Sequence, residues 1–350
     1  MITNTSGNLL TADVDALVNT VNTVGVMGKG IALQFRRAYP EMFADYTRAA
    51  KAGEVTLGRM HVWPTQALDG PRFVINFPTK RHWRSPSRMP DIEEGLDDLV
   101  RVVAELKIRS VAVPPLGCGN GGLDWGEVEP RIRAAFDALP DVDVRLFAPG
   151  VTPPAASMPT ATERPGMTPG RAALVALLRQ YEQVTLGASL IEVQKLMYFL
   201  QEAGQPLKLG YTKGHYGPYA DNLRQVLTLV EGHFLTGFGD GSARVMEAEP
   251  VRVLAGAPEE ADAALQSDPE TRARIDRVAR LAQGFESMYG LELLASVHWV
   301  ARENPAAAED AEVATELVHA WTPRKGRTFT RHHVAAALEA LRGGGWLEVA

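Results

Sequence analysis

The pattern of apolar positions differs between the two parts of the chain. Over residues 1–150, short apolar runs alternate with segments in which apolar residues recur at helical spacing, as in "DIEEGLDDLVRVVAEL". This alternation predicts an α/β sheet covered by helices on both sides. Strands are expected at residues 15–19, 58–64, 72–77, 110–116 and 142–148. Helices are expected at residues 30–37, 40–52, 92–106 and 126–139.

The second part of the chain has a mainly helical pattern. Residues 148–170 are rich in Pro, Ala, Thr and Gly and hold few large apolar residues, so they predict an interdomain linker. We therefore expect a first domain at 1–150, a linker at 151–170 and a mainly helical domain at 171–350. Its helices are expected at residues 171–185, 190–203, 220–232, 268–289, 291–301 and within 328–346.

Composition and charge narrow the function classes. The only cysteine is Cys118, so no intrachain disulfide can form, which fits a reducing cytoplasm. The start, "MITNTSGNLL", has neither a basic region nor a long apolar run, and no window reaches the ~18–20 apolar residues of a membrane span. The net charge of −6 argues against a general polyanion binder. We expect a cytoplasmic protein with no membrane partner.

The first chemical signal is a glycine loop between a strand and a helix, "NTVNTVGVMGKGIALQF" at residues 19–35. It fits neither the Walker A spacing nor the dinucleotide fingerprint. Backbone N–H groups of such a loop, together with a helix N-terminus, can still hold a pyrophosphate. An ordinary turn from strand to helix is the alternative.

A second glycine loop, "VPPLGCGNGGLDW" at residues 113–125, also follows an apolar strand. Four glycines in six residues suit a close approach of the backbone to a ligand. Because both loops follow strands of one sheet, we expect them to face each other across a cleft that holds a long phosphate-containing ligand.

A third segment, "INFPTKRHWRSPSR" at residues 75–88, carries four basic residues between Lys80 and Arg88, with a tryptophan, a histidine and no acid. Such a loop can hold nucleic-acid phosphate and stack a base. A solvated surface loop is the alternative.

These three segments together resemble macrodomains, and more narrowly the macrodomains of the DarG antitoxins. The resemblance covers roughly residues 1–150, with the motifs in the same order, and implies a mixed sheet flanked by helices. Macrodomains bind ADP-ribose. DarT toxins attach ADP-ribose to bases of single-stranded DNA and DarG antitoxins remove it, so the resemblance implies a DNA ADP-ribosyl glycohydrolase that acts in DNA repair. Two alternatives stay open: a reader that binds ADP-ribose without cleaving it, and a hydrolase of protein-linked ADP-ribose.

The resemblance also assigns roles to residues. Lys80 matches the family's catalytic lysine, whose amine can form a Schiff base with an opened ribose if its pKa is lowered. A phosphate contact is the alternative role for Lys80. Asn22 is expected to be catalytic together with Lys80, with its amide against the distal ribose. Either Asp13 or Asp15 is expected to accept from the adenine amino group. ADP-ribose contacts are expected from Asp13, Asn22, Gly25, Val26, Met27, Gly28, Lys29, Gly30, Ile31, Pro115, Leu116, Gly117, Cys118, Gly119, Asn120 and Gly121. DNA contacts are expected from Arg81, His82, Trp83 and Arg84.

One position departs from a related group of deacylating macrodomains, which carry an aspartate where this chain has Gly121. Asp124 is either a substitute for that aspartate or a helix cap. Cys118 is expected to pack rather than react, because no histidine partner is evident. No His, Cys or acid spacing predicts a metal site, and no cofactor is expected, since ADP-ribose is the substrate or product.

The second domain resembles the Panacea-type antitoxin domain in "SLIEVQKLMYFLQEAGQPLKLGYTKGHYGPYADNL", residues 189–223. The DarG resemblance implies that this domain binds a DarT toxin. Tyrosines on its glycine and proline loop are core residues or interface candidates, namely Tyr211, Tyr216 and Tyr219 with His215. Between residues 247 and 270 lie seven acids and one arginine. They form either a solvated face or a mimic of DNA phosphate that includes Glu259, Glu260 and Asp262.

Overall fold

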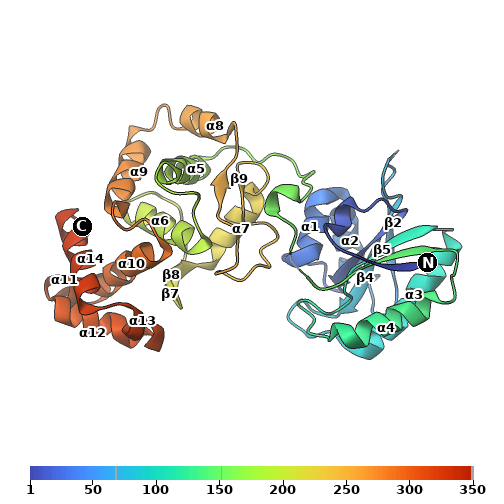
Figure 1. Ribbon diagram of the computed structural model, residues 1–350. Coiled ribbons are helices and arrows are strands. Elements are labelled where there is room, and N and C mark those ends of the chain that lie inside the picture. The colour runs from blue at the N-terminus through green and yellow to red at the C-terminus, as the bar shows by residue number, and fades with distance from the viewer. Residues whose placement is uncertain (68, 151, 348–350) are drawn as a thin grey trace. The chain divides into compact units, whose positions relative to one another are not determined.

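We describe the 350-residue chain from a computed structural model. The structure describes residues 1–67, 69–150 and 152–347. The chain forms two compact units (Figure 1). The first comprises Met1–Glu163 with Asp240–Ser242, and the second comprises Arg164–Gly239 with Ala243–Ala350. The bounds expected for the domains and the linker stay a prediction.

A six-stranded sheet forms the centre of the first unit, in the order β1-β6-β5-β2-β4-β3. All neighbouring strands are parallel except β3, which runs antiparallel to β4. The predicted mixed sheet is therefore confirmed. Its strands are β1 (Ile2–Thr5), β2 (Ala16–Asn22), β3 (His61–Pro64), β4 (Phe73–Lys80), β5 (Ser110–Val113) and β6 (Asp143–Phe147).

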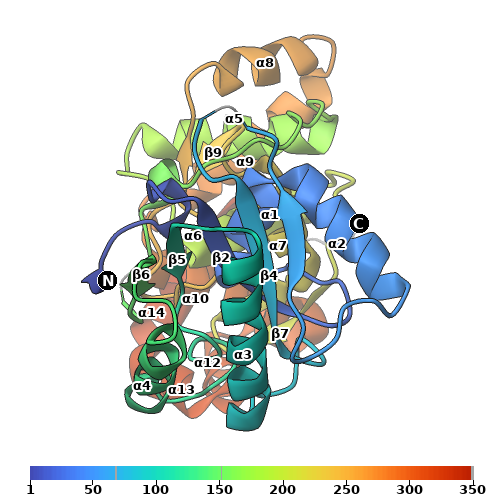
Figure 2. The same cartoon turned by 90° about the vertical axis from the view of Figure 1, so that its right-hand side faces the viewer.

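Helices cover both faces of this sheet, because β2 alternates its side chains between two cores. Ala16 and Val18 pack with apolar residues of α3 and α4, whereas Leu17 and Val21 pack with those of α1 and α2. Figure 2 shows α3 and α4 beside the strands that they cover. The helices are α1 (Gly30–Ala38), α2 (Pro40–Lys51), α3 (Met89–Glu105) and α4 (Trp125–Phe136).

Part of the predicted linker folds onto the first unit. The amide of Asn8 donates to the carbonyl of Ser157 at 3.0 Å, and the backbone N–H of Ala161 donates to the carbonyl of Arg37 at 2.8 Å. Ala155 and Met158 are buried. Residues 152–163 thus lie against the unit, with the short turn η2 (Ala155–Ser157) as their regular element.

The second unit is mainly helical, as predicted. Its helices are α5 (Pro169–Glu182), α6 (Leu190–Glu202), α7 (Asp221–Val230), α8 (Ala257–Ala264), α9 (Pro269–Ala282), α10 (Met288–Glu303), α11 (Pro305–Glu309), α12 (Ala311–Trp321), α13 (Pro323–Thr328) and α14 (Arg331–Gly343). Two small antiparallel pairs accompany them, β7 (Tyr211–Gly214) with β8 (Gly217–Ala220), and β9 (Leu235–Thr236) with β10 (Arg252–Val253). No helix in the described part of the chain is both long and apolar enough to span a bilayer.

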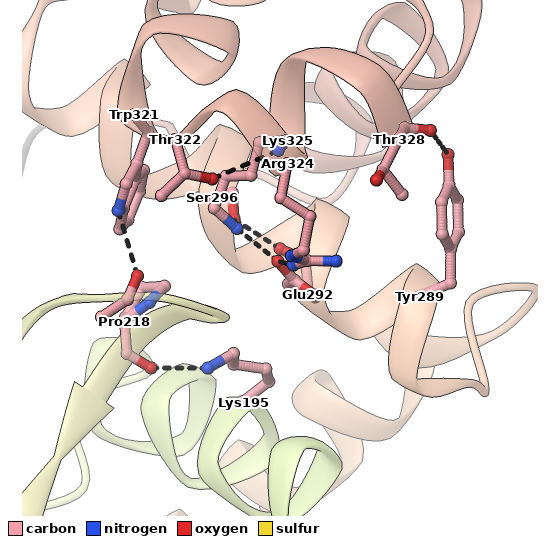
Figure 3. Close-up of polar contacts among 11 residues, drawn as sticks. Lys195, Pro218, Tyr289, Glu292, Ser296, Trp321, Thr322, Arg324, Lys325 and Thr328 are labelled. Atoms are coloured by element: carbon pink, nitrogen blue, oxygen red, sulfur yellow. Dashed lines mark hydrogen bonds and ion pairs between the residues drawn. The ribbon is translucent and has the colours of Figure 1, made fainter. Parts of the chain in front are cut away.

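Charged side chains lie inside this helical unit (Figure 3). Lys325 and Arg324 of α13 both bind the carboxylate of Glu292 on α10, and the Lys325 amine also donates to the Ser296 hydroxyl at 3.0 Å. Lys195 of α6 donates to the carbonyl of Pro218 on β8 at 2.7 Å. Lys195, Lys325 and Glu292 are almost fully buried. These polar contacts join α13 to α10, and α6 to the β7–β8 hairpin.

Candidate active site

The first glycine loop connects β2 to α1 and is held in shape by Asn22. The Asn22 side chain accepts from the N–H groups of Val24 and Val26 at 3.1 and 3.3 Å and donates to the Val26 carbonyl at 2.6 Å. Gly25 and Gly30 have φ angles of 79° and 64°, which favour glycine. Asn22 is buried, so its amide supports the loop that was expected to wrap the diphosphate.

The second glycine loop lies between β5 and α4 and is closed by its own backbone. The N–H of Leu123 donates to the Gly117 carbonyl, and the N–H of Gly122 donates to the Gly119 carbonyl, both at 3.1 Å. Gly117 and Gly122 have φ angles of 72° and 80°. Asp124 caps α4 by accepting from the N–H of Gly126 at 2.6 Å.

The three sequence segments meet at Asn120. The Lys80 amine donates to the Asn120 carbonyl at 2.8 Å. On the other side, a Cβ atom placed on Gly30 would lie 3.5 Å from the Asn120 side-chain nitrogen. The first loop, the second loop and Lys80 therefore surround one point at the carboxyl edge of the sheet, where α/β proteins bind ligands.

Lys80 ends β4 directly beside Asn22, which ends β2. The register of the two parallel strands shifts between Val21 and Asn22, so that Asn22 pairs with Lys80. Burial lowers the pKa of the Lys80 amine below its usual value. A larger fraction of this amine is therefore neutral than in a solvated lysine, as a nucleophile requires.

Gly121 has no room for a side chain. A Cβ atom at this position would lie 2.3 Å from the Gly117 carbonyl oxygen and 2.3 Å from Oγ of Ser87. The Ser87 N–H donates to the Gly121 carbonyl at 3.0 Å, and its buried hydroxyl has no partner among the described residues. The aspartate of the related deacylating group therefore cannot be accommodated in this loop geometry. Sequence reasoning missed Ser87, because nothing in the pattern signals its contact with the loop.

The other residues considered for ligand contact differ in which of their groups a ligand can reach. Met27 and Leu116 point into the hydrophobic cores, so only their backbone groups can meet a ligand. Burial raises the pKa of the Cys118 thiol to about 11, which favours packing over reactivity. Asp13 is exposed. Asp15 lies at the opposite edge of the sheet, where its carboxylate accepts from the N–H of Arg109 at 2.7 Å.

The basic loop at residues 81–84 lies next to the first glycine loop. The Arg81 carbonyl accepts from the N–H and the hydroxyl of Thr23 at 3.1 and 2.9 Å. Trp83 is 46% exposed, and the Arg84 guanidinium lies over its ring at 4.4 Å. The His82 ring lies 5.2 Å from the Trp83 ring. This arrangement presents an aromatic surface and cations to the solvent.

The tyrosines predicted for the second unit do not share one environment. The Tyr211 hydroxyl donates to the Gln194 carbonyl and its ring packs against Tyr198, so Tyr211 is a core residue. Tyr216 lies at the hairpin tip between His215 and the Arg324 guanidinium. Among the residues that the structure describes, no group of metal-binding side chains occurs in either unit.

The sheet order and the two glycine loops define the class, a macrodomain, and the Macro domain family matches residues 18–132. A DNA ADP-ribosyl glycohydrolase of Mycobacterium tuberculosis is 48% identical over 97% of this chain and 99% of its own length. A transferase–glycohydrolase fusion protein of Thermosipho africanus is 33% identical over 41% of this chain and 40% of its own length. The macrodomain of Mycobacterium tuberculosis DarG is 64% identical, with a TM-score of 0.43, over 43% of this chain and 99% of that chain.

The chain belongs to the DNA ADP-ribosyl glycohydrolase family, because the Mycobacterium tuberculosis relative matches it over nearly the full length of both proteins. The resemblance to DarG antitoxins and the prediction of a hydrolase are both confirmed.

Proposed function

We propose that this protein removes ADP-ribose from bases of single-stranded DNA and that Lys80 carries out the cleavage. The observation that supports this most is the meeting of both glycine loops with Lys80 at Asn120. In this proposal the loops supply backbone N–H groups for the diphosphate, and the Lys80 amine meets the distal ribose.

The reaction breaks the bond between the anomeric carbon of the ribose and the base. In the proposed step, the neutral Lys80 amine forms a bond to the anomeric carbon. The base leaves with the electron pair of the broken bond and takes up the proton that the amine gives up on forming its new bond. Water then hydrolyses the link to Lys80 and releases ADP-ribose. Burial of Lys80 favours this step because it raises the neutral fraction of the amine.

The loop beside the site supports a DNA substrate. Trp83 and Arg84 together offer stacking for a base and charge for phosphate, which suits single-stranded DNA. Residues Arg81, His82, Trp83 and Arg84 therefore keep their proposed role as DNA contacts.

The second unit is proposed to bind the cognate toxin, a DarT-type DNA ADP-ribosyl transferase. A relative that joins transferase and glycohydrolase in one chain supports this pairing of activities. The exposed hairpin tip with His215 and the acidic helix α8 are its candidate contact regions.

One experiment tests the enzymatic proposal. Single-stranded DNA modified by a DarT enzyme is incubated with the wild type and with Lys80→Ala, and ADP-ribose release is followed by mass spectrometry. We expect release by the wild type and none by the variant, while calorimetry shows that both bind ADP-ribose. Tight binding without release by the wild type would make the first unit a reader. Release from glutamate-linked ADP-ribose alone would make it a hydrolase of modified protein.

A further inference from the structure

A cleft lies beside the candidate active site, on the segment that follows Lys80. It has a volume of about 250 Å³ and is lined by Arg81, Ser85, Pro86, Arg88 and Asp91. This space equals several water molecules, enough for a phosphate group with part of its hydration shell. None of the residues predicted to hold ADP-ribose lines it.

The lining of this cleft favours an anion. It contains two arginines and one carboxylate, and that carboxylate already binds Arg88. Arg88 donates two hydrogen bonds to Asp91, both 3.0 Å long, so Asp91 orients the guanidinium. A guanidinium has five N–H donors in a fixed plane, and the remaining donors suit the oxygens of a phosphate.

Both ends of the segment that forms the cleft are tied to the glycine loops. Thr23 of the first loop donates two hydrogen bonds to the Arg81 carbonyl, and Ser87 donates to the carbonyl of Gly121 in the second loop. The cleft therefore keeps a fixed position next to Lys80. A strand whose modified base reaches Lys80 would continue over this segment, past Trp83 and Arg84.

We propose that this cleft binds a backbone phosphate of the DNA strand that carries the ADP-ribosylated base, with Arg88 as its main contact. The inference rests on the proposed function and adds to it, because it explains how the enzyme would distinguish a modified strand from a modified nucleoside. Phosphate contacts fix the register of the strand without reading its sequence. We therefore expect this contact to contribute the same affinity whatever bases flank the modified one.

The test compares two substrates, a modified single-stranded oligonucleotide and the ADP-ribosylated nucleoside that nuclease digestion releases from it. For Arg88→Gln, we expect KM for the oligonucleotide to rise by up to about fivefold, the upper end of what one exposed charged contact contributes. KM for the nucleoside should change less than about twofold. Arg88→Lys should recover much of the loss, because an ammonium still binds phosphate as a point charge.

A matched control is Arg101→Gln. Arg101 also pairs with an aspartate three residues away on α3, Asp98, but it does not line the cleft. Arg101→Gln should leave KM for both substrates unchanged. An equal rise of the oligonucleotide KM in Arg88→Gln and Arg101→Gln would overturn the proposal.

Three results would contradict the phosphate site. In the first, Arg88→Gln raises KM for both substrates equally. In the second it weakens the binding of free ADP-ribose, and in the third it changes none of these values. The first two results would place ADP-ribose itself in the cleft. If the wild type hydrolyses neither substrate, the proposed function fails, and the cleft is tested by binding of an unmodified oligonucleotide at salt concentrations from about 50 to about 200 mM. The slope of log affinity against log salt should then be smaller for Arg88→Gln by about 0.7, and equal slopes would overturn the proposal.

Discussion

The proposed chemistry of Lys80 depends on its surroundings. Its amine is anchored to the Asn120 carbonyl, and burial lowers its pKa from the usual 10.5. If the neutral amine is the nucleophile, kcat/KM should rise about tenfold per pH unit while Lys80 is mostly protonated, and level off at its pKa, below 10.5. A pH profile of hydrolysis checks this. A rate independent of pH between 6 and 10, tested with buffers of equal ionic strength, would argue against a neutral lysine.

Gly121 is predicted to tolerate no side chain. Because a Cβ atom would lie 2.3 Å from both the Gly117 carbonyl oxygen and Ser87, Gly121→Ala should lower the free energy of unfolding of the first unit by about 1–3 kcal/mol. Gly119→Ala is the control, since no atom lies within 4 Å of its added Cβ and its φ is not positive. Denaturant unfolding of both variants measures the difference in their free energies of unfolding. Equal midpoints would show that the loop can shift to accept the side chain.

The sequence singled out Lys80 and both glycine loops because each lies at or just after the end of an apolar strand, and strand ends share one edge of the sheet. It could not show that the Asn22 amide is engaged by its own loop, nor that Ser87 supports Gly121. These contacts depend on the bulge between β2 and β4 and on the path of the segment 81–88. Neither has a periodic or compositional signal.

Among elements, the sequence analysis missed β1 and the helices α8, α11, α12 and α13. The edge strand β1 was not predicted, because "ITNT" contains one strongly apolar residue. The predicted end of the helix at 268–289 is wrong, because α9 ends at Ala282. Gly284 has a φ of 81°, and Ser287 caps α10 by accepting from the N–H of Gly290. This glycine ends the helix although the apolar spacing continues.

The buried lysine that joins α6 to the β7–β8 hairpin should make stability depend on pH. Burial lowers the pKa of Lys195 to about 7, whereas the unfolded value is 10.5. Between these values the unfolded state binds more protons, so the free energy of unfolding should rise with pH from about 7 to 10.5. The slope contributed by one group is at most about 1.4 kcal/mol per pH unit.

Lys195→Met tests this prediction, because the variant removes the titrating group while keeping most of the length of the side chain. Hydrogen exchange in peptides from α6 and α10 should then show less stabilisation between pH 7.5 and 9.5 than the wild type does, after correction for the intrinsic exchange rate. Exposed Lys208 provides the control, as Lys208→Met should keep the wild-type dependence. An identical dependence in all three proteins would rule out Lys195 as its source.

At the scale of the whole molecule, the acids of α8 bear on toxin binding. Two of the three named acids are already paired, Glu260 with Arg164 at 2.6 Å and Asp262 with Arg179 at 2.8 Å. Both pairs are about half exposed, so each contributes about 0–1 kcal/mol and an incoming cation can replace the arginine. The described surface therefore supports both the solvated face and the phosphate mimic.

Neutralising Glu259, Glu260 and Asp262 together should weaken binding of the toxin and reduce the dependence of its affinity on salt, because fewer charges then attract the toxin's DNA-binding surface. Calorimetry of the full chain with the toxin at two salt concentrations measures both effects. A triple neutralisation of exposed Asp276, Glu316 and Glu339 is the matched control. Equal losses of toxin affinity in the two triple variants would show that only the net charge of the protein matters for binding.

Lys80→Arg separates a nucleophilic role of Lys80 in cleaving ADP-ribose from DNA from a role as a phosphate contact. Arginine keeps the positive charge but stays protonated, so it can replace a phosphate contact and not a nucleophile. We predict that the wild type releases ADP-ribose from modified single-stranded DNA and that Lys80→Arg releases it slower by roughly two orders of magnitude or more, with ADP-ribose affinity retained. Release by Lys80→Arg at the wild-type rate would contradict the account.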